Sequence, residues 1–159
     1  MKITSQAFGD HELIPEEYTC DADDLIPPLS FDEVPPDTKS LALIMDDPDV
    51  PRNLRPDGNW DHWVMWNIPP DTRRVERGKP PAGVEGKNSW GRNDYGGPCP
   101  PDKEHRYFFK LLALDSELEL SAETGKEGLL IAMAGHVIEK AELVGVYDKR
   151  IRREGARDT

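Results

Sequence analysis

Residues 88–110 read NSWGRNDYGGPCPPDKEHRYFFK, a loop rich in glycine and proline that leads directly into an aromatic segment. Prolines stiffen such a loop, while glycines allow backbone shapes that expose amide N–H groups to a ligand. In the strand that follows, alternation points His105 and Tyr107 to the same side. Beside Gly97 and Pro98 these two side chains would be convergent hydrogen-bond donors. We therefore expect a binding site here.

The ordinary alternative is that His105 and Tyr107 are rim residues of a sheet, and for an isolated pair of this spacing it is the better interpretation. Two neighbouring segments favour the binding-site interpretation instead. Residues 40–45 are nearly all apolar between turn formers, which is typical of a buried strand. Residues 60–68 form a second strong strand, and its alternation predicts a shared face for His62, Val64, Trp66 and Ile68.

Polar side chains gather at the ends of these three predicted strands. In an antiparallel sheet, the end of one strand and the start of its neighbour meet at one edge. A single pocket could therefore collect Asp47, Asp49, His62, His105 and Tyr107. In this arrangement Asp47 would accept a hydrogen bond from His62 and favour its cationic form. The histidines, the tyrosine and the loop amides would then face a phosphate or a carboxylate.

The composition limits the class of protein. A chain of 159 residues predicts one domain, which we place at residues 1–150, followed by a charged C-terminal tail at 151–159. The sequence shows no apolar run of membrane-spanning length and no signal peptide, so we expect a cytoplasmic protein without stable membrane insertion. A net charge of −11 argues against binding to nucleic acid or to an anionic membrane.

Fifteen prolines and thirteen glycines indicate many turns and favour a β-rich domain. One helix is expected, because Thr124 and Glu127 form a capping-box pattern before an apolar run that continues at helical spacing through Val137 and Ile138. Residues 143–147 are expected to form a short final strand. The two cysteines form neither a C-x-x-C pair nor a disulfide framework, and Cys20 is interpreted as a small buried hydrophobe.

Several motifs resemble the phosphatidylethanolamine-binding protein family, in its bacterial and archaeal Raf-kinase-inhibitor-like branch. They are DDPDVP at 46–51, DHW at 61–63, YGGPCPP at 95–101 and HRYFFK at 105–110, supported by PEEYTCD at 15–21. The motifs occur in the family's order, and the likeness extends over residues 2 to about 148.

The resemblance implies a mainly β fold, a sandwich of two antiparallel sheets with one short helix in the C-terminal region. It also implies a small pocket for phosphate-like anions, lined by Asp47, His62, Pro98, His105 and Tyr107 and supported by Asp49. Prokaryotic relatives often form homodimers, so a homodimer is expected as well. No cofactor and no metal are implied.

Two other classes of function compete with anion binding. His62, His105 and Asp47 could hold zinc or act as base and orienter in a hydrolase. Cys99 is the only nearby nucleophile and no helix begins at it, so we expect a protein that is not an enzyme. Alternatively, the protein could inhibit a kinase or a protease, since family members have been assigned both roles. The tryptophans at 60, 63 and 66 are interpreted as core and rim packing rather than a nucleic-acid platform.

Overall fold

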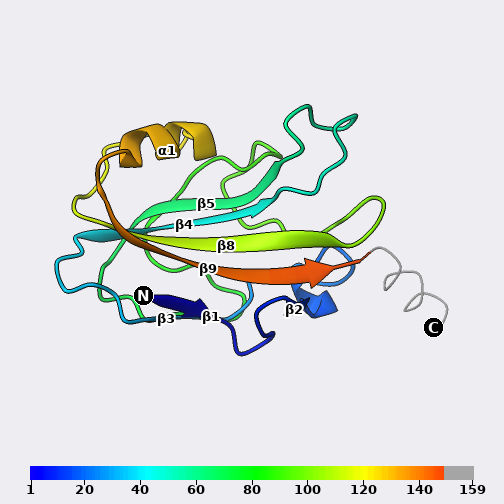
Figure 1. Cartoon of the computed structure of the whole chain (residues 1–159), viewed down its shortest axis with the longest axis horizontal. Helices are drawn as coiled ribbons and strands as arrows, with labels where there is room; N and C mark the ends of the chain where they lie inside the picture. Colours follow the sequence, from blue (N-terminus) through cyan, green and yellow to red (C-terminus); the bar gives the residue numbers. More distant parts are fainter. Residues whose placement is uncertain (149–159) are drawn as a thin grey trace.

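The computed structural model describes residues 1–148, so the predicted tail at 151–159 and the last two residues of the predicted domain lie outside the described residues. Two sheets face each other and one helix covers part of the larger sheet (Figure 1). The smaller sheet has the order β1 (Lys2–Thr4), β3 (Leu29–Asp32) and β6 (Arg74–Val75). The larger has the order β2 (Glu12–Leu13), β9 (Val137–Tyr147), β8 (His105–Leu114), β4 (Ser40–Asp47), β5 (Trp60–Ile68) and β7 (Val84–Glu85). The predicted mainly β, two-sheet fold is confirmed; every pairing is antiparallel except that of β2 with β9.

The main core lies between the two sheets. The alternate residues Tyr107, Phe109 and Leu111 of β8 are fully buried there, and Leu29 and Phe31 of β3 meet them from the smaller sheet. Period-two alternation sends one set of each strand's side chains into this core and the other set to the opposite face. This alternation fixes which side chains of β4 and β8 can reach a site at the strand ends.

The opposite face of the larger sheet is covered by α1 (Lys126–Met133), which buries Leu129 and Met133. A helix was predicted here, but its cap was wrong, because Gly125 is the N-cap residue and no side chain caps the helix. Its predicted continuation was also wrong. The chain turns at Gly135, where φ is 81°, and β9 already begins at Val137. Strand pairing with β8 thus overrides the apparent helical spacing of the β-branched residues that follow.

Strand β5 contains two irregularities that correct the predicted face of its side chains. Asn67 has a φ of 53°, and pairing with β4 shifts by one residue there. A second shift leaves His62 as an extra residue between two pairs, Met45 with Trp63 and Asp46 with Asp61. Each β-bulge changes the alternation by one position. Val64 and Trp66 therefore pack toward α1, while His62 contacts Tyr107 at the other face.

A disulfide joins Cys20 to Cys99, with the two Cα atoms 5.5 Å apart. The interpretation of Cys20 as a small buried hydrophobe was therefore wrong, and the sequence pattern did not indicate this single disulfide. Both cysteines are exposed, and 79 positions separate them in sequence. Only the fold brings them together, because their spacing matches no local motif.

The tryptophans at 63 and 66 are fully buried, as the packing interpretation predicts, and Trp60 is half-buried. Among residues 1–148, no helix has both the length and the apolar character required to cross a bilayer.

Candidate functional site

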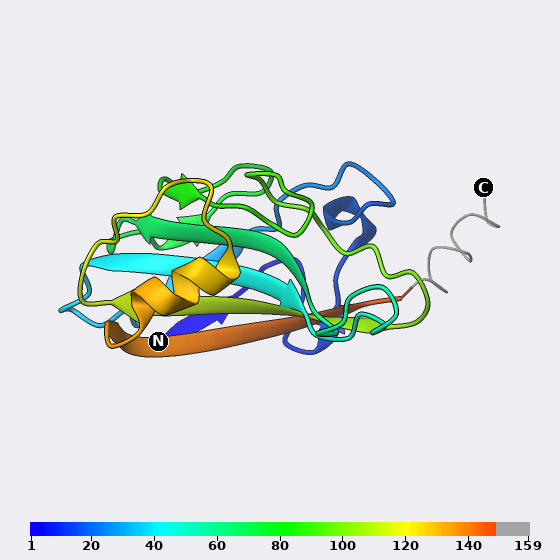
Figure 2. The same ribbon diagram turned by 90° about the horizontal axis from the view of Figure 1, so that it is seen from above.

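A cavity of about 380 Å³ opens at the end of the larger sheet where β4 ends and β5 and β8 begin. The loops at 48–59 and 98–104 lie at this end of the molecule, together with the short helix η1 (Glu16–Tyr18), and α1 lies toward the other end (Figure 2). The lining residues come from four separate segments of the chain: Cys20, Asp24, Asp47, Val50, Leu54, Trp60, His62, Trp90, Arg92, Gly97, Cys99, Pro101 and Tyr107.

Four of the seven predicted site residues line this cavity: Asp47, His62, Gly97 and Tyr107. His105 lies directly behind them, with its ring 6.5 Å from that of Tyr107 and nearly parallel to it. The His62 ring meets the same tyrosine ring edge to face at 5.3 Å, so both histidines contact Tyr107. The predicted convergence of distant strand ends is present.

His62 is almost fully buried, and its Nδ1 atom lies 2.8 Å from the carbonyl oxygen of Gly96. A carbonyl only accepts, so Nδ1 carries the proton. Burial lowers the pKa of His62, although the Gly96 carbonyl and the charge of Asp47 oppose the shift. The ring is therefore neutral at neutral pH, and its Nε2 atom is an acceptor. This corrects the expectation of a cationic His62 that donates to an anion.

Asp47 pairs with His105 instead of His62. Its Oδ2 atom lies 2.6 Å from Nδ1 of His105, and the opposite ring nitrogen, Nε2, lies 2.6 Å from Oδ1 of Asp102. Carboxylates accept at both ends, which requires a proton on each ring nitrogen. Burial acts to lower the pKa of His105, but the bonds to Asp47 and Asp102 outweigh it and the pKa is raised. His105 is thus the cationic histidine of the pair.

Tyr107 lines the cavity, and its buried hydroxyl has no acceptor among the described residues. Burial raises the pKa of Tyr107 far above its ordinary value. The neighbouring backbone N–H of Cys99 lowers this pKa, but by less than burial raises it. The hydroxyl therefore keeps its proton and can donate it in a hydrogen bond. A fully buried donor without an acceptor costs free energy unless a ligand pairs with it.

Three other predicted features occupy supporting positions. Asp49 does not line the cavity: its carboxylate binds the backbone N–H, Nε and Nη2 of Arg106, and this side-chain hydrogen bond lowers the pKa of Asp49. Pro98 accepts a hydrogen bond from the Cys20 N–H. The Gly97 N–H donates to Asp24, and the Gly96 N–H donates to the His62 carbonyl. The predicted cradle of free loop amides is therefore incorrect, since these amides are already bonded.

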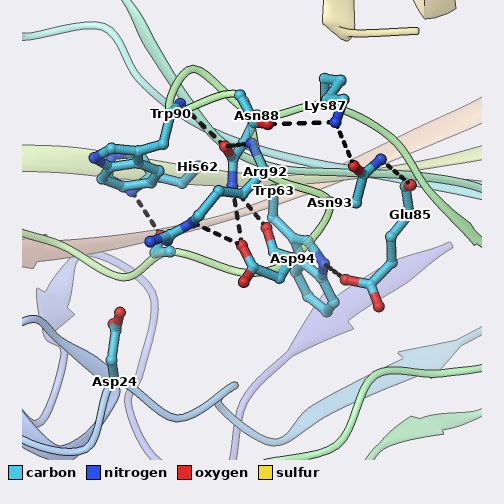
Figure 3. A network of polar contacts seen from close by, with 12 residues as sticks. Asp24, His62, Trp63, Glu85, Lys87, Asn88, Trp90, Arg92, Asn93 and Asp94 are labelled. Atoms are coloured by element: carbon cyan, nitrogen blue, oxygen red, sulfur yellow. Dashed lines mark hydrogen bonds and ion pairs between the residues drawn. The ribbon is translucent and has the colours of Figure 1, made fainter. Parts of the chain in front are cut away.

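The sequence predicted a binding site in the loop that begins at Asn88, but Trp90 and Arg92 were not among the predicted site residues. Asn88 organises this loop, because its Oδ1 atom accepts hydrogen bonds from the backbone N–H groups of both residues and its Nδ2 atom donates to the Asp94 carbonyl. Figure 3 shows Trp90 and Arg92 beside His62, with Asp24 apart from them in the lower part of the view. The sequence did signal a turn-rich loop, but hydrogen bonds from one buried asparagine to this backbone cannot be read from spacing.

Trp90 and Arg92 give the cavity an aromatic and cationic wall. The Trp90 ring meets the His62 ring edge to face at 5.1 Å, and the Arg92 guanidinium lies 5.1 Å from the Trp90 ring centre. Arg92 also bonds to Asp94 and is the single Lys or Arg among the lining residues. With Val50, Leu54 and Trp60, the mouth of the cavity is mainly apolar.

The polar groups of the cavity can therefore both donate and accept. Tyr107 and Arg92 donate, whereas His62 Nε2 and the carboxylates of Asp24 and Asp47 accept. Burial raises the pKa of Asp24, against the hydrogen bond from Gly97. Within residues 1–148, no group of three His, Cys, Asp or Glu side chains is placed to hold a metal ion.

The family can be decided from comparisons with known proteins. The sequence model of the phosphatidylethanolamine-binding proteins matches residues 4–148. The chain belongs to this family. A UPF0098 protein of Methanothermobacter thermautotrophicus is 48% identical over 153 residues, which cover 92% of this chain and 98% of the relative. A UPF0098 protein of Pyrococcus horikoshii is 42% identical, with 94% and 77% covered.

Solved structures agree with the family assignment. A putative phosphatidylethanolamine-binding protein homologue from Chlamydia trachomatis superposes with a TM-score of 0.91 at 46% identity, covering 93% of this chain and 97% of that one. YbcL of E. coli, described as a new member of the mammalian family, superposes with a TM-score of 0.82 at 27% identity, covering 92% and 96%. The predicted family is confirmed.

Proposed function

We propose that this protein binds a small anion that carries a proton, such as hydrogen phosphate or a phosphorylated head group, in the cavity beside Tyr107. The observation that carries the proposal is the Tyr107 hydroxyl, a fully buried donor that has no acceptor among the described residues. An anion oxygen at this position would satisfy it. A P–OH group of the same anion could donate to Nε2 of His62.

The surroundings suit such a ligand. Arg92 supplies a guanidinium, whose planar fork matches phosphate geometry. The cavity lining also includes the disulfide and the rings of Trp60 and Trp90. Hydrogen bonds to a charged group are stronger beside such apolar groups than in water. A volume of about 380 Å³ exceeds that of one phosphate, so an organic substituent has space toward the apolar mouth.

We propose binding rather than catalysis as the activity. Cys99, the nucleophile that a hydrolase could have used, is joined to Cys20. His105 has both ring nitrogens committed to carboxylates, so it has no lone pair with which to act as a base. The relatives named above carry UPF0098 names that state no enzymatic activity.

The test is stabilisation by inorganic phosphate, measured as a shift in melting temperature and by titration calorimetry. Tyr107→Phe removes the hydroxyl alone and should abolish the shift. Tyr147→Phe is the matched control, because its hydroxyl is bound to Asp21 and Tyr147 does not line the cavity. The control should melt at a lower temperature yet keep the full phosphate-dependent shift. If the Tyr107 variant also keeps the full shift, the anion does not bind at this hydroxyl.

A further inference from the structure

The Asp102 carboxylate accepts a hydrogen bond from Nε2, the second ring nitrogen of His105. The imidazole is fully buried between two carboxylates, but these differ in setting: the side chain of Asp47 is 4% exposed and that of Asp102 is 40% exposed. Asp102 stands on the loop that enters β8, directly after Pro101, which lines the cavity. An exposed side chain thus covers the Nε2 atom of the site's cationic histidine.

We propose that Asp102 is an internal competitor that holds the anion position on His105, and that an incoming anion binds there by displacing the Asp102 carboxylate. The proposal rests on the binding function proposed above. The charged Nε2–H of His105 is a strong hydrogen-bond donor to anions, but it already donates to the Asp102 carboxylate. An external anion can accept this hydrogen bond only when the Asp102 carboxylate moves away from Nε2.

The geometry makes this exchange feasible. Asp47 stays bonded to Nδ1 and keeps the ring charged when Asp102 moves away, because it is buried and also accepts the Asp49 N–H. Asp102 is half-exposed, so its carboxylate returns to water without being stranded in the interior. The other groups that face His105 are Tyr107 and, at longer range, Asp49. Neither offers a replacement carboxylate at Nε2.

The competition sets the affinity of the site. A carboxylate tethered to the same loop acts at an effective concentration of the order of millimolar or above, which a free anion of equal intrinsic affinity must exceed to displace it. Weak anions would therefore leave Asp102 in place, while a phosphate, with more charge and more acceptor oxygens, would replace it. Asp102 thus acts on selectivity as well as affinity.

The decisive experiment is calorimetric titration of the full chain with inorganic phosphate at pH 7. Asp102→Ala should bind phosphate about tenfold more tightly than the wild type, because the tethered competitor is gone. Glu104→Ala is the matched control: it removes the same charge from the same exposed loop and should leave the affinity unchanged. Asp102→Asn keeps the side-chain shape but loses the charge and should fall between wild type and Asp102→Ala.

Thermal melting separates this role from a purely structural one. If Asp102 only stabilises the fold, its removal should lower the melting temperature and weaken or leave unchanged the phosphate affinity. If it competes, stability falls while affinity rises. Equal or weaker binding by Asp102→Ala and Asp102→Asn would overturn the proposal.

The two proposals also fail in different ways. If the wild type binds phosphate and the Asp102 variants bind it no more tightly, the proposal that Asp102 competes is rejected and the proposed function stands. If Asp102→Ala binds phosphate and the wild type shows no measurable binding, Asp102 competes so strongly that it blocks the site in the wild type. If neither the wild type nor Asp102→Ala binds phosphate, both the proposed competition and the proposed function are rejected.

Discussion

Asp46 and Asp47 are neighbours in β4, yet they serve opposite faces of the larger sheet. Asp47 bonds to His105 at the cavity, whereas Asp46 lies 3.0 Å from Nζ of Lys110 and 3.1 Å from Nζ of Lys126 on the face covered by α1. Both carboxylates are nearly fully buried. Alternation along the strand thus separates a carboxylate of the site from one that fastens the helix to the sheet.

Asp46→Ala is expected to destabilise the fold without changing anion binding. Its removal leaves two ammonium groups without their shared partner, and the loss of a buried partner is strongly destabilising. Because Lys110 is 36% exposed and Lys126 retains Asp61, we expect a smaller loss of about 2 kcal/mol in the free energy of unfolding. Urea unfolding measures this loss, and calorimetry with phosphate should give the wild-type affinity. Weakened phosphate binding would show that the two faces are coupled.

Much of this arrangement could be predicted from the sequence. Three of the four long strands were found because apolar runs and alternation over eight to ten residues are strong local signals. The fourth, β9, was predicted only at 143–147, whereas it spans Val137–Tyr147. The meeting of Asp47, His105 and Tyr107 followed from where these strands end. The family motifs covered the same segments, so pattern and resemblance reinforced one another.

The remainder depends on geometry that spacing does not encode. One bulged residue decides where His62 points, and the bulge arises from pairing with β4. Which histidine pairs with Asp47 depends on a separation of a few ångströms across two strands. The protonation states followed from these partners: a carbonyl beside His62 and two carboxylates beside His105. Arg92 reaches the cavity from a loop whose backbone is held by hydrogen bonds to the Asn88 side chain, and Asp102 lies on the loop before β8.

The neutral state of His62 predicts discrimination between two anions of equal charge. At pH 7.5 hydrogen phosphate can donate its P–OH to Nε2 of His62, whereas sulfate has no proton to donate. We expect phosphate to bind about tenfold more tightly than sulfate, the value of one good hydrogen bond. Competition calorimetry measures the ratio, and His62→Ala should bring it close to one. Equal affinities in the wild type would contradict an acceptor at Nε2.

The same discrimination should depend on pH. Burial lowers the pKa of His62 below its ordinary value of 6.5, so the ring gains its second proton only in acid solution. Below that folded-state pKa, Nε2 becomes a donor and sulfate binding should strengthen. The sign for stability follows: the unfolded chain takes up this proton at higher pH than the folded chain, so His62 reduces stability as pH falls through 6.5. A sulfate affinity that is constant between pH 7.5 and pH 4.5 would argue against this assignment.

Gly96 provides a test of the tryptophan wall. A Cβ atom at this position would lie 2.2 Å from the Trp90 ring, so Gly96→Ala must push that ring away from its contact with His62. We expect phosphate affinity to fall by about tenfold or more and the tryptophan fluorescence to change, with a stability loss of about 1–3 kcal/mol from overpacking. Gly125→Ala is the control, because its Cβ atom meets only an ordinary contact with the Lys87 carbonyl. Wild-type affinity in Gly96→Ala would mean that Trp90 does not shape the site.

The exposed disulfide predicts that the site responds to thiol reductants. Cys20 and Cys99 both line the cavity, and closure of a loop of 79 positions contributes about 4 kcal/mol to the free energy of unfolding. Reduction by a dithiol should therefore lower the urea midpoint and weaken phosphate binding. Hydrogen bonds from Tyr95 to Tyr18 and from Gly97 to Asp24 keep the two loops close, so binding should weaken without being lost.

The Cys20→Ser/Cys99→Ser double variant should reproduce the reduced protein and show no further response to reductant. This comparison bears on location, since a cytosol that keeps thiols reduced would hold the protein in its weaker-binding form. A wild-type urea midpoint that does not move under full reduction, verified by thiol titration, would show that the disulfide adds nothing to the fold. In that case the hydrogen bonds between the two loops would be sufficient to form the cavity.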